Sequence, residues 1–503
     1  MKILNAHQVV AALTVILLAG CRVGPDYCGP PAAPVAPSWD NHGDETVRYL
    51  SPDLAGWWMR FDDPVLDALI SEAISQNLDL KVAAERIFEA RALRCTVRSD
   101  LFPQISKDAS YTFSKFATNS SGMGGLMGAF SSTADQWHWG IGGSWEIDAF
   151  GRLQRLVEAA DADIAVSAED YRDTLVILMA DVAINYVEAR SYQQRLQIAQ
   201  DNLKIQQKTL AFTQSRFKAQ LGTELDVVQA QANAESTASE IPSLQAGYRQ
   251  TLNRLSVLLG YPPGSVDEIL AEQAPVPKPP AEIAVGIPAE LLRRRPDIRR
   301  AEFELAAQTA RIGAAVGELY PKFTITGSFG LDSRDFARLF DANSIAANVG
   351  PSMQWNILNF GKFRCNVYVQ ESRQRQRCLL YQNAVLLAAE EVDNALVNYV
   401  RQKQRQANLL QAVTANQRSV DLSQKRYKGG DVSFQRVLDS QRSLLQSQDQ
   451  LALNEASITV SLIQVYRALG GGWEGAEAIA AGGMLPPEEI LIEEEVIPTP
   501  PVQ

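Results

Sequence analysis

The sequence RFKAQLGTELDVVQAQ at residues 216–231 returns 210 positions later as RYKGGDVSFQRVLDSQ at residues 426–441. Both segments place glycine, the residue best suited to a tight turn between helices, inside helix-forming sequence. A long stretch without Gly or Pro precedes each segment, and a second helix-forming stretch follows it. The pattern predicts two copies of a helical hairpin, over residues 152–260 and 362–470.

An apolar side chain recurs at every seventh position before each turn. The first stripe consists of Leu175, Val182, Ala189, Leu196, Leu203, Leu210 and Phe217, and the second of Val385, Val392, Tyr399, Gln406, Val413, Val420 and Tyr427. This spacing keeps one helix face against a neighbour and supercoils the pair. At about 1.5 Å per residue, an unbroken helix before each turn would reach roughly 100 Å. We therefore expect long coiled helices rather than a compact globule.

Composition excludes several classes of function. The chain has 503 residues and a formal net charge of −11. Nucleic-acid binding is excluded because it needs basic patches, which a strongly acidic chain does not offer. Three His and no C-x-x-C pair offer no metal site, and neither a phosphate-binding loop nor a nucleophile elbow is present. We predict no catalytic, cofactor-binding or metal-binding residues, and no enzyme. The cysteines interpreted as structural or incidental are Cys28, Cys95, Cys365 and Cys378.

Residues 1–20 have the features of a signal peptide, because Lys2 precedes an apolar run too short to span a bilayer. The sequence Leu-Ala-Gly-Cys that ends at Cys21 matches a bacterial lipobox, which predicts export and acylation of Cys21. An ordinary signal peptide cleaved near Gly20 is the alternative. More than one acyl chain makes such an anchor stable. Residues 21–60, which are rich in proline, are interpreted as a lipidated tether.

Strict apolar-polar alternation appears at about residues 103–148 and 321–357 and predicts four strands of about ten residues. The apolar positions are Ile105, Ala109, Tyr111, Phe113, Trp137, Trp139, Ile141, Trp145, Ile147, Phe323, Ile325, Phe329, Leu331, Val349, Met353, Trp355 and Ile357. Small polar residues alternate with them, which favours an outer-membrane barrel over the alternative, a soluble sandwich. Four strands cannot close a barrel, and lipid excludes open edges. The barrel must therefore be shared between chains, in a number that this reasoning does not fix.

A helix is expected before each strand pair. The first covers residues 64–99. The part of it that begins at Asp79 returns 218 positions later as the second helix, which runs from Asp297 to Glu318. Pro296 and an acidic first turn are typical of a helix start. Arg293, Arg294 and Arg295, just before it, are interpreted as a solvated junction.

The pattern predicts a modular chain. Its parts are repeat 1 at residues 61–260, a Pro-rich linker at 261–288, repeat 2 at 289–472 and an acidic, Pro-rich, disordered tail at 473–503.

Several motifs resemble the TolC-like outer-membrane factors, specifically their lipoprotein (NodT-type) branch. They are CRVGPDY at residues 21–27, WEIDAFG at 145–151, LLRRRPDI at 291–298, WNILNFG at 355–361 and ALGGGW at 468–473. The resemblance implies a mainly α fold with a membrane β-barrel portion. In a homotrimer, twelve strands would close one outer-membrane β-barrel, and the coiled hairpins would continue it as an α-helical barrel into the periplasm.

The function that the resemblance implies is a passive exit duct of a tripartite efflux system. An inner-membrane pump and a periplasmic adaptor, a membrane fusion protein, would deliver the substrates. The sequence does not separate this role from that of a type I protein-secretion duct, because the pump selects the substrate. A non-conducting structural outer-membrane lipoprotein is a further alternative, although a tether does not need amphipathic strands.

The resemblance also implies roles for the two turns. The residues expected to dock the adaptor are Arg216, Phe217, Gly222, Arg426, Tyr427 and Gly430. Asp439 and Asp226 are assigned to the entrance constriction, where threefold symmetry would make Asp439 a ring of like charges. Alternatively, Asp439 pairs with Arg436 or Arg442. Gln220 stands where the second turn has Gly430, so the two tips need not dock identically.

Overall fold

The computed structural model describes residues 22–33, 39, 47–48, 54–115, 133–280, 283–284 and 293–474. The predicted signal peptide, the lipid-anchor residue Cys21 and residues 475–503 of the tail lie outside this part of the chain. The chain divides into two compact units. Unit 1 contains Met1–Pro31, Arg86–Ser167 and Arg300–Tyr381, and unit 2 contains Ala32–Glu85, Ala168–Arg299 and Gln382–Gln503.

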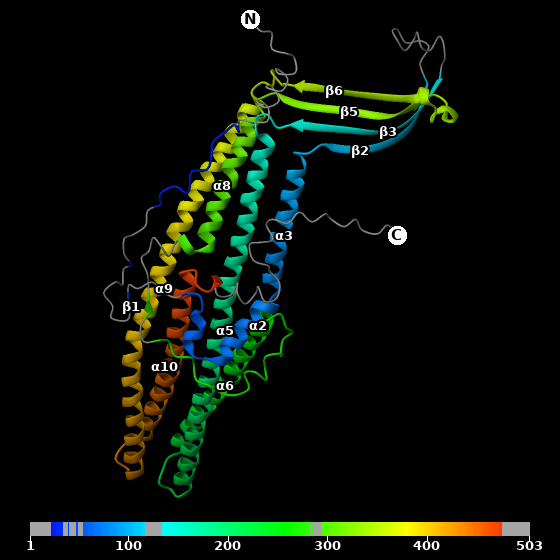
Figure 1. Cartoon of the computed structure of the whole chain (residues 1–503). Helices are drawn as coiled ribbons and strands as arrows, with labels where there is room; N and C mark the ends of the chain where they lie inside the picture. The colour runs from blue at the N-terminus through cyan, green and yellow to red at the C-terminus, as the bar shows by residue number, and fades with distance from the viewer. Residues whose placement is uncertain are drawn as a thin grey trace. The chain divides into compact units, whose positions relative to one another are not determined.

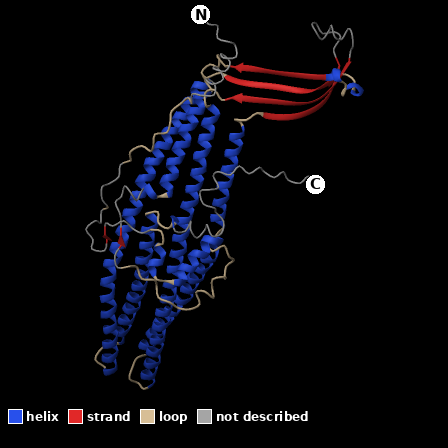
Figure 2. Ribbon diagram, viewed as in Figure 1, coloured by secondary structure: helices blue, strands red, loops and turns tan. Residues whose placement is uncertain are grey.

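Long helices dominate the described chain, and strands form one sheet and one short pair (Figures 1 and 2). The helices are α2 (Pro64–Gln76), α3 (Leu78–Ser99), α5 (Arg152–Lys218), α6 (Glu224–Leu258), α8 (Pro296–Gly317), α9 (Lys362–Gly429) and α10 (Phe434–Ala468). The strands are β1 (Val47–Arg48), β2 (Gln104–Lys115), β3 (Thr133–Ile147), β4 (Ile283–Ala284), β5 (Lys322–Ser333) and β6 (Ile345–Gln354). The 3-10 turns are Trp57–Phe61, Phe336–Arg338 and Ala342–Ser344.

Unit 1 carries an antiparallel sheet with strand order β2-β3-β5-β6. Its register places the apolar residues of all four strands on one face; Tyr111 lies opposite Trp137, and Ile141 opposite Phe329. Small and polar side chains occupy the other face. The apolar face is exposed in the single chain, with Ile105 76% and Val349 81% accessible. The strands were therefore predicted correctly, except that β6 ends at Gln354, before Trp355 and Ile357.

Lys107 lies on this apolar face without breaking the pattern. Its ammonium group lies 4.9 Å from the centre of the Trp139 ring, a distance at which a cation is attracted to the aromatic face. Pro351, which lacks a backbone donor, belongs to β6 at the margin of the sheet.

In unit 2 the seven-residue stripes form much of the core. Leu175, Val182 and Ala189 of α5 are fully buried, as are Val392 and Tyr399 of α9. Toward the turns the two stripes diverge, because Phe217 is 45% exposed whereas its counterpart Tyr427 is only 7% exposed. The helices are therefore packed through the predicted face along most of the hairpin.

The helix expected over residues 64–99 is interrupted at Asn77, which corrects the prediction. The Asn77 side chain accepts a hydrogen bond from the Leu80 amide at 2.9 Å, as an N-cap does, and donates one to the Leu258 carbonyl at 2.8 Å. The Asn77 side chain thereby caps the start of α3, directly after α2 ends, and binds this junction to the end of α6. At the other end of α2, Asp63 accepts hydrogen bonds from the amides of Val65 and Leu66.

Arg295 contradicts the expectation of a solvated junction. Its side chain is 10% exposed and donates to the Asp297 and Glu391 carboxylates, at 2.8–3.0 Å, and to the carbonyl of Ala468. Burial alone would lower the pKa of the Arg295 guanidinium, but hydrogen bonds and charge from the two carboxylates raise it. Arg295 therefore ties the start of α8 to α9 and to the end of α10, whereas Arg294 forms an exposed pair with Glu474.

We predict that Arg295→Ala lowers stability by about 2–3 kcal/mol, because the buried Ala468 carbonyl and the part-buried Asp297 carboxylate lose their donor. Arg294→Ala, the matched control, should cost under about 1 kcal/mol, as exposed pairs do. Thermal unfolding of the detergent-solubilised protein, followed by circular dichroism, compares the two variants. Equal shifts in the melting temperature would contradict the assignment of Arg295 as a structural tie.

Candidate docking tip and entrance

The two hairpin turns share one backbone geometry. At the end of α5, the amide of Leu221 donates to the Arg216 carbonyl, and that of Gln220 to the Phe217 carbonyl. At the end of α9, the amides of Asp431 and Gly430 bond the carbonyls at the equivalent positions, those of Arg426 and Tyr427. Both pairs of bonds form a Schellman motif, which satisfies the last carbonyls of a helix.

The two turns have different residues at the position of this motif where the backbone is left-handed, with a positive φ. Gly430 has φ of 83°, which glycine adopts freely, whereas Gln220 has φ of 59°. A side chain in this conformation costs about 1–2 kcal/mol. Gly222 lies in the first turn as expected, but the left-handed position of that turn belongs to Gln220. Gly222 follows two residues later and precedes the N-cap Thr223.

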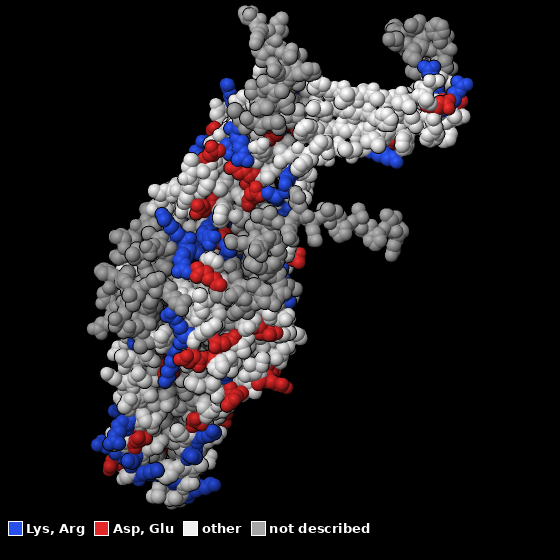
Figure 3. Space-filling view, in the orientation of Figure 1, with Lys and Arg blue, Asp and Glu red and all other residues white. Residues whose placement is uncertain are grey.

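Basic side chains gather at the ends of the two long helices, where their charge is favourable beside the helix C-terminus. The last turns carry Arg216, Lys218, Arg426 and Lys428. Lys and Arg also gather at the turns on the face shown in Figure 3. Of the predicted docking residues, Phe217, Arg426 and Gly430 are exposed, whereas Tyr427 is buried.

The Arg216 side chain makes contacts within the chain that connect the two turns. Its guanidinium donates to the Leu221 carbonyl at 3.0 Å, across its own turn, and to the Tyr427 carbonyl at 3.0 Å, in the other hairpin. It also lies 4.8 Å from the centre of the Tyr427 ring. Arg216 therefore joins the two turns, which its sequence counterpart Arg426 does not do among the contacts of the described residues.

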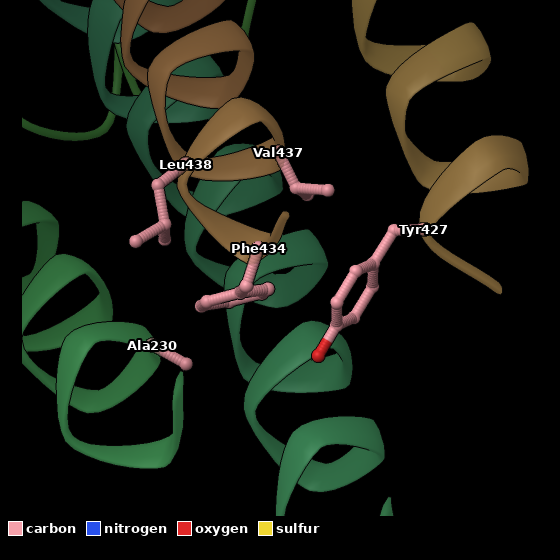
Figure 4. Packing of buried hydrophobic residues seen from close by; sticks show 5 residues of the cluster. All are labelled: Ala230, Tyr427, Phe434, Val437 and Leu438. Carbon is pink, nitrogen blue, oxygen red and sulfur yellow. The ribbon is translucent and has the colours of Figure 1, made fainter. Parts of the chain in front are cut away.

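Tyr427 lies in a small core under the tip. It packs with Ala230, Phe434, Val437 and Leu438, as Figure 4 shows. Its ring is 5.2 Å from that of Phe434, measured between ring centres. Burial, together with the negative charge of Asp226, raises the pKa of Tyr427, while the charge of Arg216 opposes this shift. The phenol therefore stays neutral at physiological pH.

The two acidic residues assigned to the entrance occupy different environments. Asp226 completes a capping box with Thr223 at the start of α6 and lies 3.5 Å from the Tyr427 hydroxyl. Asp439 is exposed and accepts a hydrogen bond from Gln435 at 2.9 Å. Arg442 donates to Asn233 instead, and among the contacts of the described residues the partner of Asp439 is Gln435 rather than an arginine. The alternative in which Asp439 pairs with Arg436 or Arg442 is therefore not seen in the single chain.

A groove of about 360 Å³ lies near the tip and contains both charged and apolar side chains. Its lining residues are Ile205, Lys208, Thr209, Phe212, Gln417, Val420, Asp421, Gln424, Tyr427, Lys428 and Val437. The groove runs between α5 and α9, with α10 contributing Val437. The sequence did not predict this groove, because its residues come from three segments far apart in the chain.

The capping box at Thr223, in contrast, could have been predicted from the spacing T-x-x-D at residues 223–226.

The described residues contain no group of three or more His, Cys, Asp and Glu side chains arranged to hold a metal ion. Within the same residues, no helix combines the length and apolar character needed to cross a bilayer.

Comparisons with known proteins agree on one family. Residues 69–261 and 287–471 match the family model described as outer membrane efflux protein. Nodulation protein T of Rhizobium leguminosarum bv. trifolii is 35% identical over 442 residues, which cover 87% of this chain and 91% of that protein. The probable outer membrane lipoprotein SilC of Salmonella typhimurium is 30% identical, with 93% and 99% of the two chains covered.

A solved structure extends the likeness to the fold. The outer-membrane channel OprN superposes with a TM-score of 0.83 at 33% identity, covering 90% of this chain and all of that one. The described fold is therefore that of an outer-membrane channel protein.

The shared turn geometry predicts opposite effects of two substitutions. Gln220→Gly should stabilise its turn by roughly 1 kcal/mol, since glycine removes the left-handed penalty, and Gly430→Gln should destabilise the other by a similar amount. Hydrogen exchange of the Leu221 and Asp431 amides measures both effects locally. If Gln220→Gly leaves exchange unchanged or speeds it, Gln220 is not the strained position.

Proposed function

The chain belongs to the outer membrane efflux protein family, and from this premise we propose that three copies form the exit duct of a tripartite efflux system. An inner-membrane pump supplies the energy, and a periplasmic adaptor joins the pump to the tip of the duct. The duct itself conducts passively, in agreement with a sequence that offers no catalytic constellation.

The sheet of unit 1 carries this proposal. Within the described chain, β2 and β6 each pair on one side only. Unpaired backbone groups cost several kcal/mol each in hydrocarbon, so a membrane sheet must close on itself. Three copies of a four-stranded sheet supply twelve strands, a number within the range of known barrels. The exposed apolar face then meets lipid, and the polar face lines the lumen.

The lipobox at Cys21 supports an acyl anchor beside the barrel, as does the similarity to a protein described as a probable outer membrane lipoprotein. The anchor and the barrel place the chain in the outer membrane, with the long hairpins reaching into the periplasm. A type I secretion duct would share this architecture. A non-conducting lipoprotein is disfavoured by the closed barrel that the sheet demands.

We assign the adaptor contact to the exposed part of the tip. Phe217 offers an apolar anchor and Arg426 an exposed cation, and both residue types are enriched at protein–protein interfaces. The neighbouring groove presents Lys208, Lys428 and Asp421 for orientation. Arg216 and Tyr427 hold the two turns together beneath this surface, so their contribution to docking is indirect.

Phe217→Ala and Arg426→Ala should each weaken adaptor binding about tenfold or more, by removing interface anchors. Arg375→Ala, a control that removes an exposed arginine from another part of α9, should leave affinity unchanged. Surface plasmon resonance with the periplasmic adaptor of an efflux system from the same cell measures the affinities. Full affinity in both tip variants would exclude this docking surface.

We further propose that Asp439 forms a ring of like charges at the periplasmic mouth, because threefold symmetry repeats its exposed carboxylate three times. The role of Asp226 is to hold the first turn in place beside this ring, through its capping box and its proximity to Tyr427.

The Asp439→Ala, Asp226→Ala double variant should raise the resting conductance of the closed channel, since the charge ring and one support of the turn are removed together. Asp439→Ala alone should mainly reduce cation preference. Gln435→Ala, which removes only the hydrogen-bond donor to Asp439, serves as the control. Planar-bilayer recording measures both properties, and an unchanged closed state in the double variant would count against these positions.

A further inference from the structure

Four cysteines of the described chain are free, and all four belong to unit 1: Cys28, Cys95, Cys365 and Cys378. The periplasm is an oxidising compartment, in which accessible thiols that meet form disulfides. Cys95, near the end of α3, and Cys365, at the start of α9, are both exposed in the single chain.

The internal repeat relates these two positions to a contact that the structure shows. Helix α3 and helix α8 each have 22 residues and begin 218 positions apart, while α5 and α9 begin 210 positions apart. Sheet register follows the same shifts, since the pair Gln104↔Ser144 becomes Lys322↔Gln354. The two repeats are therefore built alike, strand pairing included.

Between the repeats, α5 packs closely against α8. A β-carbon built on Gly313 of α8 would lie 2.9 Å from Cγ of Arg155 in α5. Subtracting 218 from 313 gives Cys95, and adding 210 to 155 gives Cys365. The two cysteines thus occupy the repeat equivalents of two residues in direct contact.

In a closed ring of copies, repeat 1 and repeat 2 alternate around the ring. Each repeat 2 therefore meets repeat 1 of the next chain, and because the repeats are built alike, this contact resembles the one between repeat 1 and repeat 2 within a chain. The equivalent of α5 against α8 is then α9 of one protomer against α3 of its neighbour. This step rests on the proposed trimer. It places Cys365 of each protomer beside Cys95 of the adjacent one.

We propose that Cys95 and Cys365 of adjacent protomers form a disulfide, so that three such bonds join the trimer covalently. Cγ of Arg155 stands where the Sγ of a cysteine would be, and the Cβ-to-Sγ separation across a disulfide is about 3 Å, close to the 2.9 Å of the equivalent contact. At the equivalent positions, α8 has Gly313 and Gly317 whereas α3 has Cys95 and Ser99. The proposed bond therefore requires α3 and α9 of adjacent protomers to bring the two cysteine Cα atoms within about 4.4–6.8 Å of each other.

The bond forms by thiol–disulfide exchange with an oxidised periplasmic dithiol–disulfide protein. One cysteine thiolate attacks the disulfide of that protein, and the second thiolate then displaces it from the mixed disulfide. Both electrons and both thiol protons leave with the exchange protein, which is released as a dithiol. The new sulfur–sulfur bond links two chains and leaves no other product.

Cys28 and Cys378 provide matched controls. Both line one cavity of about 320 Å³ in unit 1, between residues 25–31 and helices α8 and α9. Any disulfide formed by this pair within one chain leaves that chain a monomer on a denaturing gel. Only the pair at Cys95 and Cys365 is expected to produce covalent oligomers.

The test uses the full chain, extracted from outer membranes with free thiols blocked by N-ethylmaleimide and denatured in SDS without reductant. A band of three chain masses that dithiothreitol converts to monomer is expected. Cys95→Ser and Cys365→Ser should each reduce it more than tenfold, whereas Cys28→Ser and Cys378→Ser should leave it unchanged. Co-expressed Cys95→Ser and Cys365→Ser chains with different tags should give a covalent heterodimer, which pairing within one chain cannot produce.

Light scattering of the native protein separates the two possible failures. Three chains per particle with only monomers on the non-reducing gel would overturn the disulfide and leave the trimer intact. One chain per particle would overturn the trimer of the proposed function itself. Covalent trimers that persist in Cys95→Ser or Cys365→Ser would also refute this pairing.

Discussion

The backbone hydrogen bonds left open along β2 and β6 constrain everything else in this chain. Water could satisfy these groups, but hydrocarbon cannot, and the exposed apolar face of the same sheet is suited to hydrocarbon. One chain therefore cannot complete its own membrane part. The two repeats share their strand register and helix lengths. Strand β6 of one copy can therefore pair with β2 of the next copy in the way that β3 pairs with β5 within the chain.

At the other end of the hairpins, one backbone motif supports two chemically different tips. Both long helices end in the same pair of hydrogen bonds, yet Gly430 meets the left-handed position freely and Gln220 under strain. Arg216 and Tyr427 are used to bind the turns to each other, which leaves their counterparts, Arg426 and Phe217, exposed. The two similar hairpins thus present an asymmetric surface at their turns, where one side offers Phe217 and the other Arg426.

Periodicity predicted most of the fold, because seven-residue and two-residue spacings report directly on which face of a helix or strand is buried. The helix break at Asn77 was missed, since its side chain acts through the distant carbonyl of Leu258. The burial of Arg295 was missed for the same reason, as Glu391 and Ala468 lie about a hundred residues or more away in sequence. At the tip, sequence reasoning grouped Arg216 with Arg426, although only tertiary contacts distinguish their roles.

We propose that copies of this chain share one conducting barrel. The most direct test is single-channel recording of the purified, detergent-extracted protein in a planar bilayer, with the oligomeric mass measured on the same sample. A barrel shared by three copies predicts three chains per particle and small, discrete conductance steps. A well-folded helical monomer that gives no steps would contradict it and would instead favour a non-conducting outer-membrane lipoprotein.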